Sequence, residues 1–101
     1  MRLAQVIGQV VATVRNPALG MDKLLLVHFF DREGEPERAL HVAVDNLGAG
    51  IGEWVLVVAG SSARLSVGHG GSGDASPVDL CVVGIVDQVT SEAGLNFRKD
   101  G

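Results

Sequence analysis

The chain has 101 residues, enough for one domain that buries roughly two-thirds of its unfolded surface, and too few for a second domain. Apolar residues make up 47% even without the 14 glycines, which is more than a small monomer needs and favours a surface covered by other subunits. Eight basic and twelve acidic residues leave a formal charge of −4, and the scattered cations form no stripe that could follow a nucleic acid.

The single cysteine, Cys81, lies within an apolar run, so the chain cannot form an internal disulfide. We interpret it as a small core residue in a reducing compartment. The N-terminal segment has Arg2 but lacks the unbroken apolar stretch of a signal peptide. No run approaches the roughly 18 apolar residues of a membrane span. These features predict a cytoplasmic protein without a membrane partner.

The first half of the chain has the pattern of three strands. Apolar residues or glycine occupy every even position from 4 to 14, which is the period of a β-strand. After a turn at 16–20, the segment 23–30 is almost wholly apolar, so we expect both faces of this strand to be buried. The charged segment 31–38 is then an exposed connection to a third strand at 39–45.

Between the third strand and a fourth at 53–59 lies a loop with glycine at every second position, namely Gly48, Gly50 and Gly52. Glycine tolerates positive φ and lets another backbone approach closely. Three glycines in five residues therefore predict a shaped loop with few side chains and a close neighbour. That neighbour can be a phosphate, a substrate or another protein chain.

A tight turn at 60–64 opens the second half of the chain. Its serines, Ser61 and Ser62, are candidate N-caps for one short helical turn, because a serine oxygen can accept an unpaired N–H of the first turn. A glycine- and serine-rich loop follows at 68–77, and its composition offers little to hold one conformation.

The fifth strand, at 78–89, has Gly84 in its middle, which marks a bulge or a barrel corner. Five strands, one short helical turn and no long amphipathic helix predict an all-β fold. We expect a small five-stranded OB-like β-barrel, since an open sheet would leave unprotected edges. The barrel domain is placed at 1–89 and a C-terminal tail at 90–101, which either docks weakly or adds an edge strand.

The sequence contains no motif for catalysis or for a cofactor. The glycine loop lacks the G-x-G-x-x-G spacing, a following long helix and the Lys-Ser/Thr of a P-loop. The histidines form no HxH, HExxH or Cys/His cluster for a metal, and Ser61 and Ser62 lie in no G-x-S-x-G elbow. Four aromatic residues and a negative charge do not suit a single-strand binder. We expect no enzyme, no cofactor, no metal and no nucleic acid.

Asp45 and Glu53 flank the glycine loop, and two interpretations are open. A carboxylate pair can do acid–base chemistry. The interpretation that we favour is structural: the two carboxylates cap N–H groups of the loop or pair with Arg64.

Several short motifs follow one another along nearly the whole chain. They are GQVVAT at 8–13, LG at 19–20 with KLL at 23–25, VAVD at 42–45 with GAGIGE at 48–53, GSSAR at 60–64, and PVD at 77–79 with VGIVD at 83–87. In this order they resemble the vertex proteins of bacterial microcompartments, the EutN/CcmL family. The resemblance implies an OB-like barrel that assembles into a homopentamer, closes the five-fold vertices of a polyhedral shell and contacts hexameric shell proteins.

The resemblance also implies which residues meet at the five-fold axis or at the subunit interface. They are Gly48, Ala49, Gly50, Ile51, Ser61, Ser62 and Arg64. Five copies around an axis must bring backbones close together, and small residues permit this. Arg64 is either an intersubunit partner of Asp45 or Glu53, or a solvent-exposed turn residue.

Two hypotheses of function follow. The first is a structural shell protein, a homopentamer in the shell of a cytoplasmic microcompartment with a narrow axial opening for small solutes. The alternative is a small-ligand or nucleotide-binding β-barrel that uses the loop 48–52 and needs no oligomer.

Overall fold

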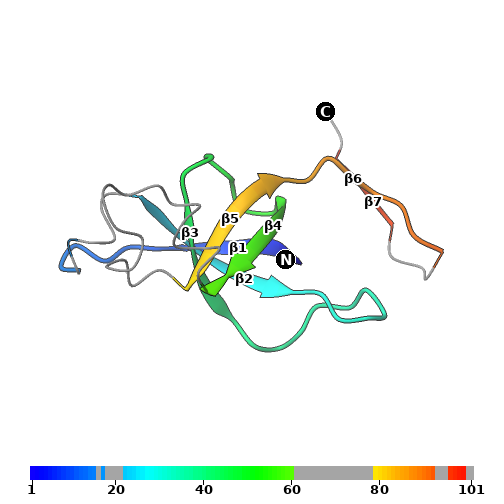
Figure 1. Cartoon of the computed structure of the whole chain (residues 1–101), viewed down its shortest axis with the longest axis horizontal. Coiled ribbons are helices and arrows are strands. Elements are labelled where there is room, and N and C mark those ends of the chain that lie inside the picture. Colours follow the sequence, from blue (N-terminus) through cyan, green and yellow to red (C-terminus); the bar gives the residue numbers. More distant parts are fainter. Residues whose placement is uncertain (16, 18–21, 61–78, 93–95, 100–101) are drawn as a thin grey trace.

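The computed structural model describes residues 1–15, 17, 22–60, 79–92 and 96–99. Five of its strands close into a barrel, whose arrangement can be followed in Figure 1. The strands are β1 (Arg2–Val10), β2 (Lys23–Phe29), β3 (His41–Asp45), β4 (Trp54–Ala59) and β5 (Leu80–Ile85). The barrel closes in the order β1-β2-β3-β5-β4, with β3 and β5 parallel and the other pairs antiparallel. This confirms the predicted all-β, OB-like five-stranded barrel. The helical turn expected after Ser61 and Ser62 lies outside the described residues.

The first strand is shorter than its sequence pattern predicts. β1 ends at Val10, which pairs with Leu24 near the start of β2, whereas the alternation of apolar residues continues to Val14. Among the described residues no strand pairs with the chain beyond that point, and Val11 and Val14 are 79% and 95% exposed. The prediction of a strand to residue 14 was wrong because alternation alone does not supply a partner strand.

The barrel interior holds one main apolar cluster, to which every barrel strand contributes. Its buried members are Ala4, Val6, Leu25, Val27, Phe29, Ala43, Ala49, Val55, Val57 and Val82. A second cluster, made of Leu24, Val44, Val58 and Cys81, uses the opposite face of β2, β3, β4 and β5. β2 thus buries residues on both faces, as predicted. Burial raises the pKa of the Cys81 thiol, which agrees with a core role rather than a reactive one.

The fifth strand is also interrupted. The pairing of β4 with β5 shifts register where Leu56 faces Gly84 and Val57 faces Val82, so Val83 is the extra residue of a bulge. Of the two features predicted at Gly84, a bulge or a barrel corner, the structure shows a bulge at the residue before it. The strand then ends at Ile85, short of the predicted end at residue 89.

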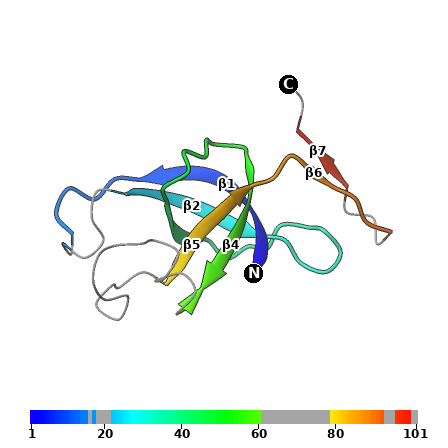
Figure 2. The same ribbon diagram turned by 45° about the horizontal axis from the view of Figure 1, so that its top comes forward.

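Beyond the barrel, the chain forms a two-stranded hairpin that projects from the end of β5 (Figure 2). Its strands are β6 (Gln88–Val89) and β7 (Phe97–Arg98). The tail therefore adds a strand, but its partner is β6 rather than an edge of the barrel. This pairing crosses the boundary expected at residue 89, and the division into a barrel domain and a tail stays a prediction. None of the described residues forms a helix long and apolar enough to span a membrane.

Candidate functional site: the glycine loop

The glycine loop, residues 46–53 between β3 and β4, is fastened at its start by Asp45. This carboxylate is only 2% exposed. Its Oδ1 accepts the N–H of Leu47 at 2.9 Å and its Oδ2 accepts the N–H of Ala49 at 2.8 Å. A buried carboxylate is stable only when such donors replace water. Asp45 therefore fixes the first half of the loop and carries Ala49 into the barrel core.

Glu53 fastens the second half of the loop. Its Oε1 accepts the N–H of Gly50 at 2.7 Å, and its Oε2 accepts a charged hydrogen bond from Nζ of Lys99 at 2.5 Å. The bond from Lys99, followed by the bond from Gly50, lowers the pKa of Glu53. The hydrogen bond with Glu53 in turn raises the pKa of Lys99. The predicted capping of loop N–H groups by Asp45 and Glu53 is confirmed.

Strands β1 and β2 add further contacts to the loop. The N–H of Gly52 donates to the carbonyl of Val6 at 2.7 Å, and Nε2 of Gln5 donates to the carbonyl of Gly52 at 3.2 Å. Nζ of Lys23 donates to the carbonyl of Ala49 at 3.3 Å. The loop is therefore held from its own two ends and from the neighbouring barrel wall.

The three glycines of the loop do not serve the same purpose. Gly48 has φ of +89° and Gly52 has φ of +93°, in the left-handed region that favours glycine. Gly50 has no positive φ, and a Cβ placed on it would meet only Oε1 of Glu53, at 3.4 Å. Two glycines therefore shape the turn itself, whereas the subunit has room for a side chain at Gly50.

The loop presents apolar side chains outward. Ile51 is 71% exposed and Leu47 is 50% exposed, next to the small residues Gly50 and Gly52. A rigid loop with an exposed apolar tip is suited to contact with another protein surface, because exposed apolar groups gain most when they are covered.

The same geometry counts against a phosphate site. The N–H groups of Leu47, Ala49, Gly50 and Gly52 already donate to oxygens of the same subunit. Two of the acceptors are carboxylates, which would repel an anion. The loop cannot cradle a phosphate without giving up the contacts that shape it.

The described residues contain no group of three or more His, Cys, Asp or Glu side chains that could hold a metal. Nε2 of His28 lies 3.2 Å from Oε1 of Gln5, and the ring of His41 packs on Phe29 at 4.7 Å. His28 thus has a hydrogen-bond partner on β1, and His41 packs against the ring of Phe29.

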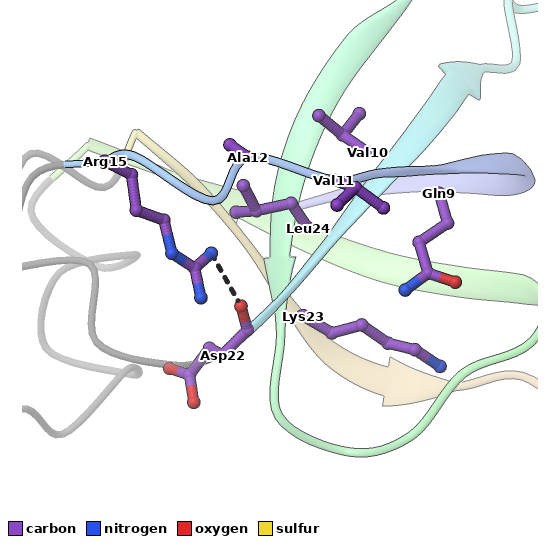
Figure 3. Close-up of a pocket in the computed structure, with 8 residues that line it drawn as sticks. All are labelled: Gln9, Val10, Val11, Ala12, Arg15, Asp22, Lys23 and Leu24. Atoms are coloured by element: carbon purple, nitrogen blue, oxygen red, sulfur yellow. Dashed lines mark hydrogen bonds between the residues drawn. The ribbon is translucent and has the colours of Figure 1, made fainter.

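A hollow of about 240 Å³ lies beside the loop (Figure 3). Its lining residues are Gln9, Val10, Val11, Ala12, Arg15, Asp22, Lys23 and Leu24. Nη1 of Arg15 donates to the carbonyl of Asp22 at 3.0 Å across this hollow. The lining shares Lys23 with the glycine loop.

The structure leaves part of the predicted interface untested. Ser61, Ser62 and Arg64 lie outside the described residues. Their role, and the pairing of Arg64 with Asp45 or Glu53 of a neighbouring subunit, stay predictions. Sequence reasoning also assigned no role to the side chains that hold the loop from elsewhere, Gln5, Lys23 and Lys99. Their partners lie far along the chain, and no local pattern indicates them.

Residues 1–87 match the sequence profile of the family described as "Ethanolamine utilisation protein EutN/carboxysome". The chain belongs to the EutN/CcmL family. It is 54% identical over 99 residues to the bacterial microcompartment shell vertex protein EutN of Escherichia coli strain K12. The match covers 98% of this chain and 100% of that protein. The family resemblance inferred from the ordered motifs is confirmed.

Solved structures of EutN/CcmL proteins share the fold. A structure described as "Ethanolamine utilization protein, EutN" is 54% identical, covers 98% of this chain and 99% of its own, and superposes with a TM-score of 0.84. The GrpN pentameric microcompartment shell protein from Rhodospirillum rubrum is 44% identical, covers 90% of this chain and 99% of its own, and gives a TM-score of 0.76.

Proposed function

We propose that this chain is a structural shell protein that forms homopentamers and caps the vertices of a bacterial microcompartment. The observation that carries the proposal is 54% identity, over nearly the full length of both chains, to a protein named as a shell vertex protein. A pentameric shell protein of known structure also superposes on 90% of this chain. A nucleotide- or ligand-binding role gains no support, because the N–H groups of Leu47, Ala49, Gly50 and Gly52 already donate within the subunit.

The glycine loop is the part of the subunit that we place at the five-fold axis, with Gly48, Gly50 and Ile51 next to a narrow opening and with the buried side chain of Ala49 anchoring the loop in the barrel core. Two observations support this placement: the loop is fixed within the subunit, and Ile51 is exposed without an internal partner surface. Head-to-tail contacts around an axis close into a ring when the rotation fits. A preformed loop lowers the ordering cost of making that contact.

Ser61, Ser62 and Arg64 belong to the same proposed interface. The intersubunit partner of Arg64 is more readily Glu53 than Asp45, because Asp45 is buried and both of its oxygens accept loop N–H groups. Glu53 has a quarter of its side chain exposed and lies beside the loop.

The role is structural rather than catalytic. The carboxylates that flank the loop are used as hydrogen-bond acceptors for its backbone, and neither is left to move a proton. The location that follows is the shell of a microcompartment in the bacterial cytoplasm. Its other neighbours there are hexameric shell proteins.

Native mass spectrometry tests the proposal directly. We expect the main species to have five times the 10.5-kDa mass of the chain. A protein that stays monomeric over a wide concentration range would contradict the pentamer. Electron microscopy of shells produced with a tagged chain then tests the location, with label expected at the vertices and not on the facets.

A further inference from the structure

The junction of the glycine loop with β4 is contacted by the far end of the chain. Glu53, the last residue of the loop, bonds Lys99 through Oε2 and the N–H of Gly50 through Oε1. The Glu53 carboxylate thus links the N–H of Gly50 to Lys99, which lies 46 positions after Glu53.

The next residue, Trp54, contacts the same terminal segment. Its ring stacks on Phe97 of β7 with centroids 4.2 Å apart and an interplanar angle of 11°. On its other side Phe30 stacks at the same distance, with an angle of 28°. Offset stacking of this kind adds to the free energy of burial alone. The ring of Trp54 therefore seats β7 against the barrel.

Backbone contacts complete this attachment. The N–H of Lys99 donates to the carbonyl of Asp87 at 2.8 Å, and the N–H of Val86 donates to the carbonyl of Trp54 at 2.8 Å. The hairpin of β6 and β7 has only two residues in each strand, too few to be stable alone. Its position is consequently set by Trp54, Glu53 and the backbone beside them.

The N–H of Gly50 depends on this attachment. Asp45 holds Leu47 and Ala49, and β1 holds Gly52, but the acceptor for Gly50 is the Glu53 side chain. That side chain is 24% exposed. Without a cation on its second oxygen, it is free to turn towards water, because solvent competes for an exposed carboxylate.

We propose that the C-terminal hairpin, β6 and β7 with Lys99, is a clasp that positions the glycine loop for contact between subunits, with Lys99 and Glu53 as its positioning residues. The inference rests on the proposed function in placing this loop at the ring contact. It assigns a role to the tail that neither the motifs nor the relatives' names describe. It also makes assembly depend on an ion pair that salt can weaken.

Lys99→Met tests the clasp in the full-length chain, because methionine keeps an apolar stem and removes the cation. Arg98→Met is the matched control, since it removes a neighbouring positive charge that makes no ion pair with the described residues. The readouts are the Gly50 amide in TROSY spectra recorded across pH, and the pentamer dissociation constant from native mass spectrometry.

In the Lys99→Met variant we expect the Gly50 N–H to exchange roughly tenfold faster, the order expected when a charge-assisted hydrogen bond is weakened. The acid titration of the Gly50 amide shift should move to higher pH, and the pentamer should dissociate at higher protein concentration. Arg98→Met should change none of these values. Lys99→Arg should restore them, because arginine keeps the cation.

An unchanged Gly50 amide in the Lys99→Met variant would overturn the clasp. So would a changed amide with an unchanged pentamer dissociation constant, because the loop would then not be positioned for the ring. A wild-type chain that is itself monomeric would contradict the proposed vertex function instead, and this failure is seen before any variant is made.

Discussion

The two ends of the glycine loop are held by carboxylates in opposite situations. Asp45 is buried, and both of its oxygens serve the loop itself. Glu53 is partly exposed and divides its oxygens between Gly50 and Lys99. The first half of the loop is therefore part of the folded core, whereas the second half depends on the tail and on the solvent conditions.

Contacts that stabilise the fold and contacts that serve assembly therefore lie at opposite ends of one eight-residue loop. A hydrogen bond inside the core cannot be lost without loss of barrel stability, because water cannot reach a buried donor to replace its lost acceptor. A contact at the surface can be weakened while the barrel stays folded. Substitutions at the Asp45 end should thus act on the subunit, and substitutions at the Glu53 end on the ring.

Asp45→Ala is expected to have the largest effect. It removes the acceptors of the N–H groups of Leu47 and Ala49, and the Ala49 N–H is then left unpaired in a buried site, so we expect the free energy of unfolding to fall by about 3 kcal/mol. Urea denaturation at fixed protein concentration measures this loss. Asp45→Asn, which keeps one acceptor oxygen, should lose less. Equal stability of Asp45→Ala and wild type would remove the distinction between the two ends.

Gly48→Ala and Gly50→Ala form the next comparison, with one glycine in each half of the loop. Gly48 has φ of +89°, so a side chain there should cost about 1 kcal/mol of subunit stability. Gly50 has no positive φ and has room for a Cβ, so its substitution should leave thermal unfolding of the subunit unchanged. If both variants lose the same stability, the conformational argument for Gly48 fails.

Gly50→Val extends this comparison to the ring. The larger side chain should keep the barrel fold, seen as an unchanged far-UV circular dichroism spectrum, and should prevent five loops from meeting around an axis. Native mass spectrometry should then show monomers or incomplete rings. An unchanged pentamer mass would argue against an axial position of Gly50. Gly50→Ala, the smaller substitution at the same position, is the matched control.

Sequence patterns predicted the barrel well where a local signal reports burial. The apolar segments at 23–30, 39–45 and 53–59 place β2, β3 and β4 within two residues of their observed bounds. Carboxylates at both ends of a glycine loop correctly predicted capping, because the donors and acceptors are close in sequence.

The remaining features depend on contacts that no local pattern carries. The residues after Val10 keep the period of a strand but have no described partner strand, so the alternation misleads. Lys23 and Lys99 reach the loop from 26 and 46 positions away, and each sits in a segment whose own composition explains it as an ordinary surface lysine. These contacts form only when the folded barrel places β2 and the tail beside the loop, so the sequence alone does not show them.

The pH dependence of Glu53 is the smallest and most specific test of the difference between the two ends. Lys99 and the Gly50 N–H lower the pKa of Glu53 below its usual 4.5, so the folded state binds a proton less readily there than the unfolded chain does. The resulting stability is present above about pH 4.5 and is lost as the pH falls through the lowered pKa.

Glu53→Gln should flatten this part of the curve of stability against pH, whereas the curve of Arg98→Met should follow the wild type. Because the pair is exposed, added salt should reduce the wild-type acid dependence as well, and a salt-independent curve would place the titrating group in the core.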